Sequence, residues 1–319
     1  MTDSEVLLQQ VIIGLSNGMI IALIALGYTM VYGIVELINF AHGDLFMLGA
    51  FLALTIAGAL GLDAVSEGAL FSWGILPMFV AAPIFCGGVN WCVDRLAYRP
   101  LRNAPRLAPL VSAIGVSFVF LNIGLLWGGL PMEVFNMGQT AAAPKDFPAL
   151  VSNENLLGES DITLTISQVL VFVITVPLMI GLSVLVRFTR LGKAMRAVAQ
   201  NPVAARLMGI DVDRVIGATF IIGGALGGVA SVVYALYNNT IYFQMGFRVG
   251  LDAFTAAVLG GIGNLPGAVL GGLVIGMIRA LTDQYIATEW TNVMVFAVLI
   301  LVLIFRPAGL LGTHAQEKV

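Results

Sequence analysis

Long runs of apolar residues, separated by short polar connectors, dominate the pattern along the chain. A helix that crosses a membrane needs about 20 mostly apolar residues, and runs of roughly that length recur from one end of the chain to the other. They lie at residues 11–34, 45–60, 70–92, 107–129, 164–186, 214–237 and 290–305, with a weaker, glycine-rich region at 251–281. The pattern therefore predicts an all-α, polytopic membrane helix bundle of about eight or nine spans.

The span count stays open because of one stretch in the weaker region. Gly and Pro interrupt AVLGGIGNLPGAVLGG (257–272), and such residues mark places where a membrane helix can break. A break there would add a crossing between residues 238 and 289.

Composition supports the membrane assignment. The chain is 59% hydrophobic and only 10% charged, with a mean hydropathy of +0.98, whereas soluble domains carry about 25% charged residues. A water-facing globular protein is therefore excluded. No long polar stretch is available to fold apart from the apolar runs, so we expect residues 1–319 to form a single transmembrane domain.

Charged residues are sorted by sign between the connectors. The connectors at 93–106 and 187–214 hold ten of the 15 Lys and Arg, whereas the connectors at 61–69 and 130–163 are acidic. The acidic residues are Asp63, Glu67, Glu133, Asp146, Glu154, Glu159 and Asp161. Because basic connectors stay in the cytoplasm, we expect both basic connectors inside and the N-terminus outside. Arg306 predicts an inside C-terminal end, which requires an odd number of crossings.

Two segments share a layout that suggests an internal repeat. YGIVELINFAHGDLFMLGAFLAL (32–54) and YNNTIYFQMGFRVGLDAFTAAVL (237–259) each place Gly and Asp near the start of an apolar run. The predicted topology puts their connectors on opposite sides, as an inverted repeat requires. A chance match of two glycine-containing connectors is the alternative.

Polar residues near the start of the second apolar run are the first candidates for a functional site. Asn39, His42 and Asp44 lie at or just inside the membrane edge, where ionisable groups usually face protein or a water-filled path. Asp44 is expected to cap the next helix. His42 either lines a substrate path or satisfies a connector carbonyl, and a His42–Asp44 proton relay is a third possibility.

The basic connector FTRLGKAMRAVAQNPVAARLMGIDVDRV (188–215) predicts short amphipathic helices. Asn201 suits an N-cap, Pro202 suits the first helical turn, and Gly209 can end that helix. Such a connector can dock into a groove on a partner protein, or it can simply fix topology and bind anionic membrane lipid.

Motifs for catalysis are missing from the sequence. GGIGNLPG (260–267) is no phosphate-binding loop, because it lacks the GxxxxGK[ST] pattern. The chain has no HExxH, no GxSxG and no Cys/His ligand cluster. We therefore expect no catalytic residue, no metal site and no ATP site in this chain, and no enzyme activity of its own. The recurring GxxxG spacings at 14/18, 224/228 and 272/276 predict close helix packing.

Four stretches resemble the permeases of high-affinity branched-chain amino-acid ABC transporters. They are LINFAHGDLFMLGAF (37–51), GKAMRAVAQNPVAARLMGI (192–210), FTAAVLGGIGNLPGAVLGG (254–272) and FRPAGLLG (305–312). The chain is most similar in this family to the smaller of two related permeases. The resemblance implies a multi-pass protein of the bacterial inner membrane, paired with a second permease subunit. It also implies two cytoplasmic ATPase subunits, which bind the ATP, and a periplasmic substrate-binding protein. No nucleic acid is implied.

The resemblance also implies a coupling site in the basic connector. VAARLMG (203–209) is similar to the ABC-permease motif EAAxxxG, although Val203 replaces the Glu and so removes one ion pair with the ATPase. The expected ATPase-coupling residues are Arg196, Ala204, Ala205, Arg206 and Gly209.

The translocation path is expected to be lined by small and mildly polar residues, because tight binding would prevent release. The candidates are Asn17, Asn39, His42, Asp44, Asn122, Gln244 and Asn264. Arg248 and Asp252, on the expected outer connector, are hypothetical contacts for the binding protein. A urea or short-chain amide ABC permease and a secondary transporter coupled through Asp44 and His42 remain alternatives.

Overall fold

The computed structural model describes residues 3–35, 39–62, 71–102, 104–105, 107–158 and 160–312. Leu37 and Ile38, which begin the first signature stretch, lie outside the described residues. So do the connector residues Asp63, Glu67, Arg106 and Glu159.

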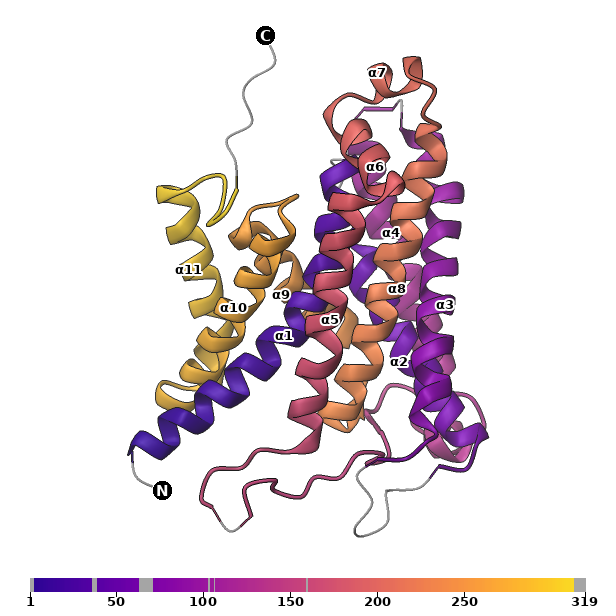
Figure 1. Ribbon diagram of the computed structural model, residues 1–319. Helices are drawn as coiled ribbons and strands as arrows, with labels where there is room; N and C mark the ends of the chain where they lie inside the picture. Colours follow the sequence, from indigo (N-terminus) through magenta and orange to yellow (C-terminus); the bar gives the residue numbers. More distant parts are fainter. Residues whose placement is uncertain are drawn as a thin grey trace.

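Helices make up most of the described chain (Figure 1). They are α1 (Asp3–Val35), α2 (Ala41–Ala59), α3 (Ile75–Val93), α4 (Leu107–Gly128), α5 (Ile166–Phe188), α6 (Arg190–Gln200), α7 (Pro202–Leu207), α8 (Val212–Asn238), α9 (Met245–Gly260), α10 (Leu265–Tyr285) and α11 (Thr291–Phe305). Shorter helical turns are η1 (Asp94–Tyr98), η2 (Arg99–Leu101), η3 (Glu133–Gly138) and η4 (Thr288–Trp290). Two short strands, β1 (Lys145–Asp146) and β2 (Thr240–Ile241), pair antiparallel.

The number of long helices agrees with the prediction. In the described part of the chain, 8 helices are long and apolar enough to cross a membrane, while α9 has only 16 residues. The predicted break falls between α9 and α10, where Gly261 and Gly263 adopt φ angles of 106° and 87°. Such positive φ angles suit glycine, which has no Cβ to clash with the backbone.

Glycines hold the core helices in close contact, as the GxxxG spacing predicts. A Cβ at Gly18 would lie 2.8 Å from the Cα of Leu273, and one at Gly272 would lie 2.6 Å from the backbone nitrogen of Ala22. These contacts join α1 to α10. Because lipid gives no hydrophobic force between helices, such backbone-to-backbone approach is a main source of their association.

The two ends of the bundle carry different connectors (Figure 1). The helical hairpin of α6 and α7 projects from one end, and the N-terminus lies at the other. Ion pairs of Arg99 and Arg102 with Asp213 place both basic connectors at the same end, as predicted. At the opposite end, β1 from the acidic connector pairs with β2, and Phe71 bridges to Val151.

A buried lysine organises the acidic connector. Lys145 is 1% exposed, and its ammonium group donates hydrogen bonds to the carbonyl oxygens of Phe135 and Thr140. Burial lowers the pKa of Lys145, because the charged form is disfavoured away from water.

Helices α2 and α9 meet at their N-terminal ends. A Cβ at Gly43 would lie 2.8 Å from the Cα of Gly250, and the rings of Phe40 and Phe254 lie 6.0 Å apart. In these two pairs the residue number rises along α9 as it falls along α2, so the two helices are antiparallel at this contact. This antiparallel geometry is the one that an inverted repeat requires.

Candidate functional site

Asp44 lies in the first turn of α2 but does not cap that helix, so the expected capping role is wrong. The helix begins at Ala41, after an N-cap at Phe40 that makes no side-chain cap bond. Because α2 starts four residues earlier than a cap at Asp44 would require, the carboxylate reaches α4 instead. The Ser117 hydroxyl donates a hydrogen bond to Asp44 Oδ2. Asp44 Oδ1 is buried and has no hydrogen-bond partner among the described residues.

His42 occupies a tight space between α1 and α8. Its ring and the Tyr28 ring are T-shaped, with their centroids 4.7 Å apart. Its Cε1 would lie 2.7 Å from a Cβ at Gly27 and 3.4 Å from one at Gly227. Neither ring nitrogen makes a hydrogen bond of good geometry with a described residue. His42 and Asp44 are therefore not bonded to each other, and the structure offers no direct proton relay between them.

Asn39 belongs to a buried polar cluster. Its side chain accepts a hydrogen bond of 2.7 Å from the Tyr98 hydroxyl and donates one of 3.3 Å to Asn90 Oδ1. Asn90 in turn donates to the carbonyl oxygen of Phe220 at 2.7 Å. The cluster therefore ties the start of α2 to α3, η1 and α8.

An apolar groove of about 470 Å³ lies beside the contact of α2 with α9. Its walls come from α1, α4 and α9 and include Tyr28, Ile114, Phe118, Leu251 and Phe254. Ser117, whose hydroxyl binds Asp44, also lines it, as do Gly246 and Gly250. The groove thus offers a largely apolar surface with buried polar groups directly behind its wall. A site of this type suits a small ligand with an aliphatic part.

The other candidate path residues do not all gather at this groove. Asn17 is half-buried in α1, and Asn122 is exposed on α4, where it donates to the carbonyl oxygen of Phe118. Gln244 is exposed and immediately precedes α9. Asn264 caps α10 by accepting from the Gly267 amide, and it donates to the carbonyl oxygen of Leu311. Asn39, His42 and Asp44 thus face different neighbouring helices at the start of α2, and Asn264 has a local structural partner.

The hypothetical outer contacts lie elsewhere than expected. Arg248 and Asp252 belong to α9 itself, not to a connector. Asp252 forms an ion pair of 2.6 Å with Arg279 of α10, and its side chain is only 13% exposed. Helix packing and the ion pair thus cover the Asp252 carboxylate, whereas Arg248 is exposed, and a contact of Arg248 with the binding protein stays a prediction.

The hairpin of α6 and α7 forms as its local sequence predicts. The Asn201 side chain accepts hydrogen bonds from the amides of Val203 and Ala204, and Pro202 occupies the first helical turn. Gly209 follows α7 with a φ of 82°. Of the expected coupling residues, Ala205 is buried, whereas Arg196, Ala204, Arg206 and Gly209 are exposed.

An exposed apolar edge on α7 was not predicted. Val203, Leu207 and Met208 are 66%, 84% and 82% exposed. Residues 203 and 207 are four apart and so share one helix face. This spacing of two apolar residues is the sequence signal for the edge. Exposed apolar side chains that lie together are a candidate contact surface.

Ser117 and the aromatic wall of the groove were also missed. A lone Ser inside an apolar run carries no pattern, and its role depends on the distant Asp44. Within the described residues, no group of three or more His, Cys, Asp or Glu is placed to hold a metal ion.

Many apolar helices, a groove beside converging helix ends and a projecting hairpin define a polytopic membrane permease. The sequence profile of a known family matches residues 10–303, and this chain belongs to that family, described as branched-chain amino acid transport system / permease component.

Known relatives match over nearly the full chain. The high-affinity branched-chain amino acid transport system permease protein LivH of Escherichia coli (strain K12) is 40% identical over 316 residues, or 98% of this chain and 97% of that protein. The corresponding protein BraD of Pseudomonas aeruginosa is 41% identical, covering 98% of each chain. A probable branched-chain amino acid transport permease protein LivM of Methanocaldococcus jannaschii is 31% identical over 39% of this chain and 40% of that protein.

Proposed function

We propose that this chain is a permease subunit that carries branched-chain amino acids across the bacterial inner membrane. It pairs with a second, related permease subunit in an ATP-driven importer. Two cytoplasmic ATPase subunits bind and hydrolyse the ATP, and a periplasmic binding protein delivers the amino acid. The chain needs no cofactor of its own.

The exposed apolar edge of α7 is the observation that carries this proposal. The three apolar side chains of Val203, Leu207 and Met208 protrude from a hairpin that is rigidly capped by Asn201. Arg206 on the same helix and Arg196 on α6 add positive charge. An ATPase groove that accepts this edge would bias the permease by binding one of its conformations more tightly than the other.

The shape of the groove supports an aliphatic cargo. Its wall is built from Ile114, Phe118, Leu251 and other apolar side chains, against which an aliphatic side chain loses contact with water. Asp44 and Ser117 lie at one wall and can meet a polar group weakly. Urea would gain little from such a wall, because it has no aliphatic part.

The test is uptake of labelled leucine by cells with and without this gene. We expect uptake to fall on deletion, to be competed by unlabelled valine, and to follow ATP depletion, not an uncoupler. Unchanged leucine uptake with lost urea uptake would contradict the cargo and leave the ATP-driven mechanism standing. Uptake that follows the proton gradient would contradict the mechanism itself and favour the secondary transporter.

A further inference from the structure

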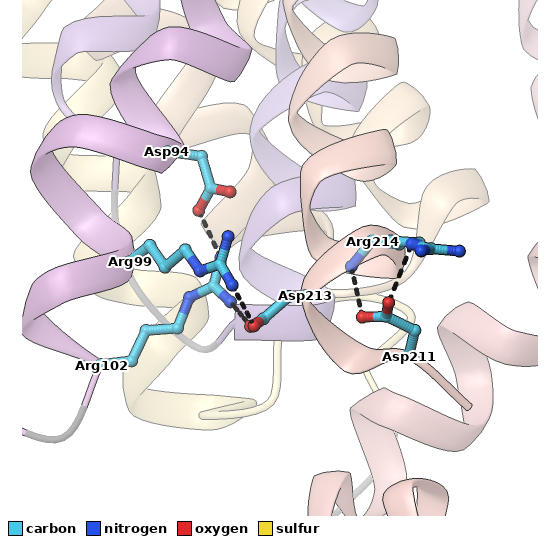
Figure 2. A network of polar contacts seen from close by, with 6 residues as sticks. All are labelled: Asp94, Arg99, Arg102, Asp211, Asp213 and Arg214. Carbon is cyan, nitrogen blue, oxygen red and sulfur yellow. Dashed lines mark hydrogen bonds and ion pairs between the residues drawn. The ribbon is translucent and has the colours of Figure 1, made fainter. Parts of the chain in front are cut away.

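A cluster of four charged side chains joins the two basic connectors. Arg102 donates from one guanidinium nitrogen to Asp213 Oδ1 at 2.5 Å and from another to Asp94 Oδ1 at 2.6 Å (Figure 2). Asp213 also accepts from Arg99 at its second oxygen, at 2.7 Å. Arg102 and Asp94 are the least exposed members, with side chains 15% and 6% exposed. Each residue therefore binds a partner from this cluster, and Arg102 and Asp213 each bind two.

The cluster lies between the hairpin and α3. Asp213 is in the first turn of α8, which follows α7 after a connection of four residues, and Asp94 begins η1 at the end of α3. The neighbouring pair of Asp211 and Arg214 lies apart from the cluster (Figure 2). The cluster therefore links α8, the helix directly after the hairpin, to η1 and η2.

Close packing makes α3 and α8 a rigid pair below the cluster. A Cβ at Gly224 would lie 2.5 Å from the carbonyl oxygen of Cys86, and one at Gly228 would lie 2.5 Å from that of Ala82. Packed interfaces of this kind shift as units because they resist continuous deformation.

Hydrogen bonds extend this unit to the start of α2. Tyr98 ends η1, packs its ring 5.6 Å from Phe220 of α8, and donates to Asn39. Asn39 precedes His42 and Asp44 by three and five residues. The segment Asp94–Tyr98 is a π-helical turn, a local irregularity that is frequent at functional sites.

We propose that Asp94, Arg99, Arg102 and Asp213 act with Tyr98 as positioning residues that transmit the movement of the coupling hairpin to the start of α2. This inference rests on the proposed ATP-driven function. The cluster keeps η1 and η2 fixed to α8, and Tyr98 passes their displacement to Asn39. Without the cluster, η1 and η2 follow α8 less closely, so less of the movement reaches Asn39 through Tyr98 and less leucine is imported per ATP hydrolysed.

The test uses the full complex of permeases, ATPases and binding protein in proteoliposomes, with leucine uptake and ATP hydrolysis measured in the same vesicles. Asp213→Asn removes two ion pairs at once, and we expect leucine imported per ATP hydrolysed to fall about fivefold or more, the usual lower range of coupling between sites. Asp213→Glu keeps the charge and should restore most of this ratio.

Two further variants separate the cluster from the hydrogen-bond route. Arg102→Lys keeps the charge but has one nitrogen in place of a planar fork, so it cannot hold Asp94 and Asp213 in the same geometry. Tyr98→Phe removes only the hydroxyl that binds Asn39 and leaves all three ion pairs in place. We expect both to lower the ratio while ATP hydrolysis continues.

Arg214→Gln is the matched control, because it removes a basic residue from the same connector and leaves the cluster intact. Its ratio should equal that of the wild type. A wild-type ratio in both Asp213→Asn and Tyr98→Phe would overturn the inference, as would uptake and hydrolysis that fall together in step with lost complex. If the wild-type complex shows no ATP-driven leucine uptake, the proposed function fails first and takes this inference with it.

Discussion

At the residue scale, single glycines decide how closely α2 and α9 approach each other. Gly43 faces the backbone of Gly246 and Gly250, so a side chain at this position would push the two helix ends apart. The same contact brings Asp44 beside Gly246 and close to the groove. A polar residue behind the wall of the groove is thus positioned by the absence of a side chain on the opposite helix.

Replacing Gly43 tests this close approach. We expect Gly43→Ala to destabilise the permease by about 1–3 kcal/mol, the usual cost of overpacking, and to lower leucine uptake. Thermal unfolding of the purified complex in detergent measures the first effect. Gly181→Ala in α5 is the control, because a Cβ there meets nothing within 4 Å. Equal melting temperatures for Gly43→Ala and the wild type would contradict the packing argument.

Helix α7 is the element on which coupling to ATP depends in this proposal. Its fold is local, since Asn201 caps its start and Gly209 follows its end. Its outer edge has no partner within the described chain, because Leu207 is 84% exposed. The helix is therefore capped by its own residues and presents an uncovered apolar edge.

Placing a charge on this edge tests the docking surface. We expect Leu207→Asp to weaken binding of the ATPase subunits by about 2 kcal/mol or more, the usual size of an interface hot spot. Co-purification of the ATPase with the permease measures this loss. Leu156→Asp, at an exposed position in the acidic connector at the opposite end, should leave co-purification unchanged. A wild-type yield of ATPase with Leu207→Asp would rule out this edge as the docking surface.

At the scale of the whole molecule, the charges are sorted between the two ends of the bundle. Basic connectors lie at one end and the acidic connector lies at the other, so the membrane potential and anionic lipid favour a single orientation. The chain starts at the end opposite to α7, and its last apolar helix is expected to finish at the end of α7. An odd number of passes is therefore needed, and counting α9 with the 8 long helices gives nine.

Cysteine labelling tests that orientation. Cys92 is exposed and Cys86 is buried, so Cys92→Ser provides the background. We expect a membrane-impermeant maleimide to label Leu156→Cys on intact spheroplasts and to label Met208→Cys only after permeabilisation. The reverse result would place the basic connectors outside and would exclude a cytoplasmic ATPase at α7.

Much of the architecture and part of the site followed from local sequence. The apolar runs predicted the long helices to within a few residues at most ends, although α1 starts at Asp3, well before the predicted 11. The caps at Asn201 and Gly209 were also predicted, because each depends on hydrogen bonds or backbone angles within a few residues. Asp44 failed as a cap because the true start of α2 placed it within reach of Ser117, 73 residues away.

The sequence by itself determined the membrane class, the gathering of the basic connectors at one end and the hairpin, because composition, charge and local hydrogen bonds suffice for these. Only the tertiary structure decided which glycines face which backbones and which polar groups meet. Asp213 lies 111 residues from Arg102, and Tyr98 lies 59 residues from Asn39. No local pattern encodes such pairs, since each depends on how helices pack after every span is in place.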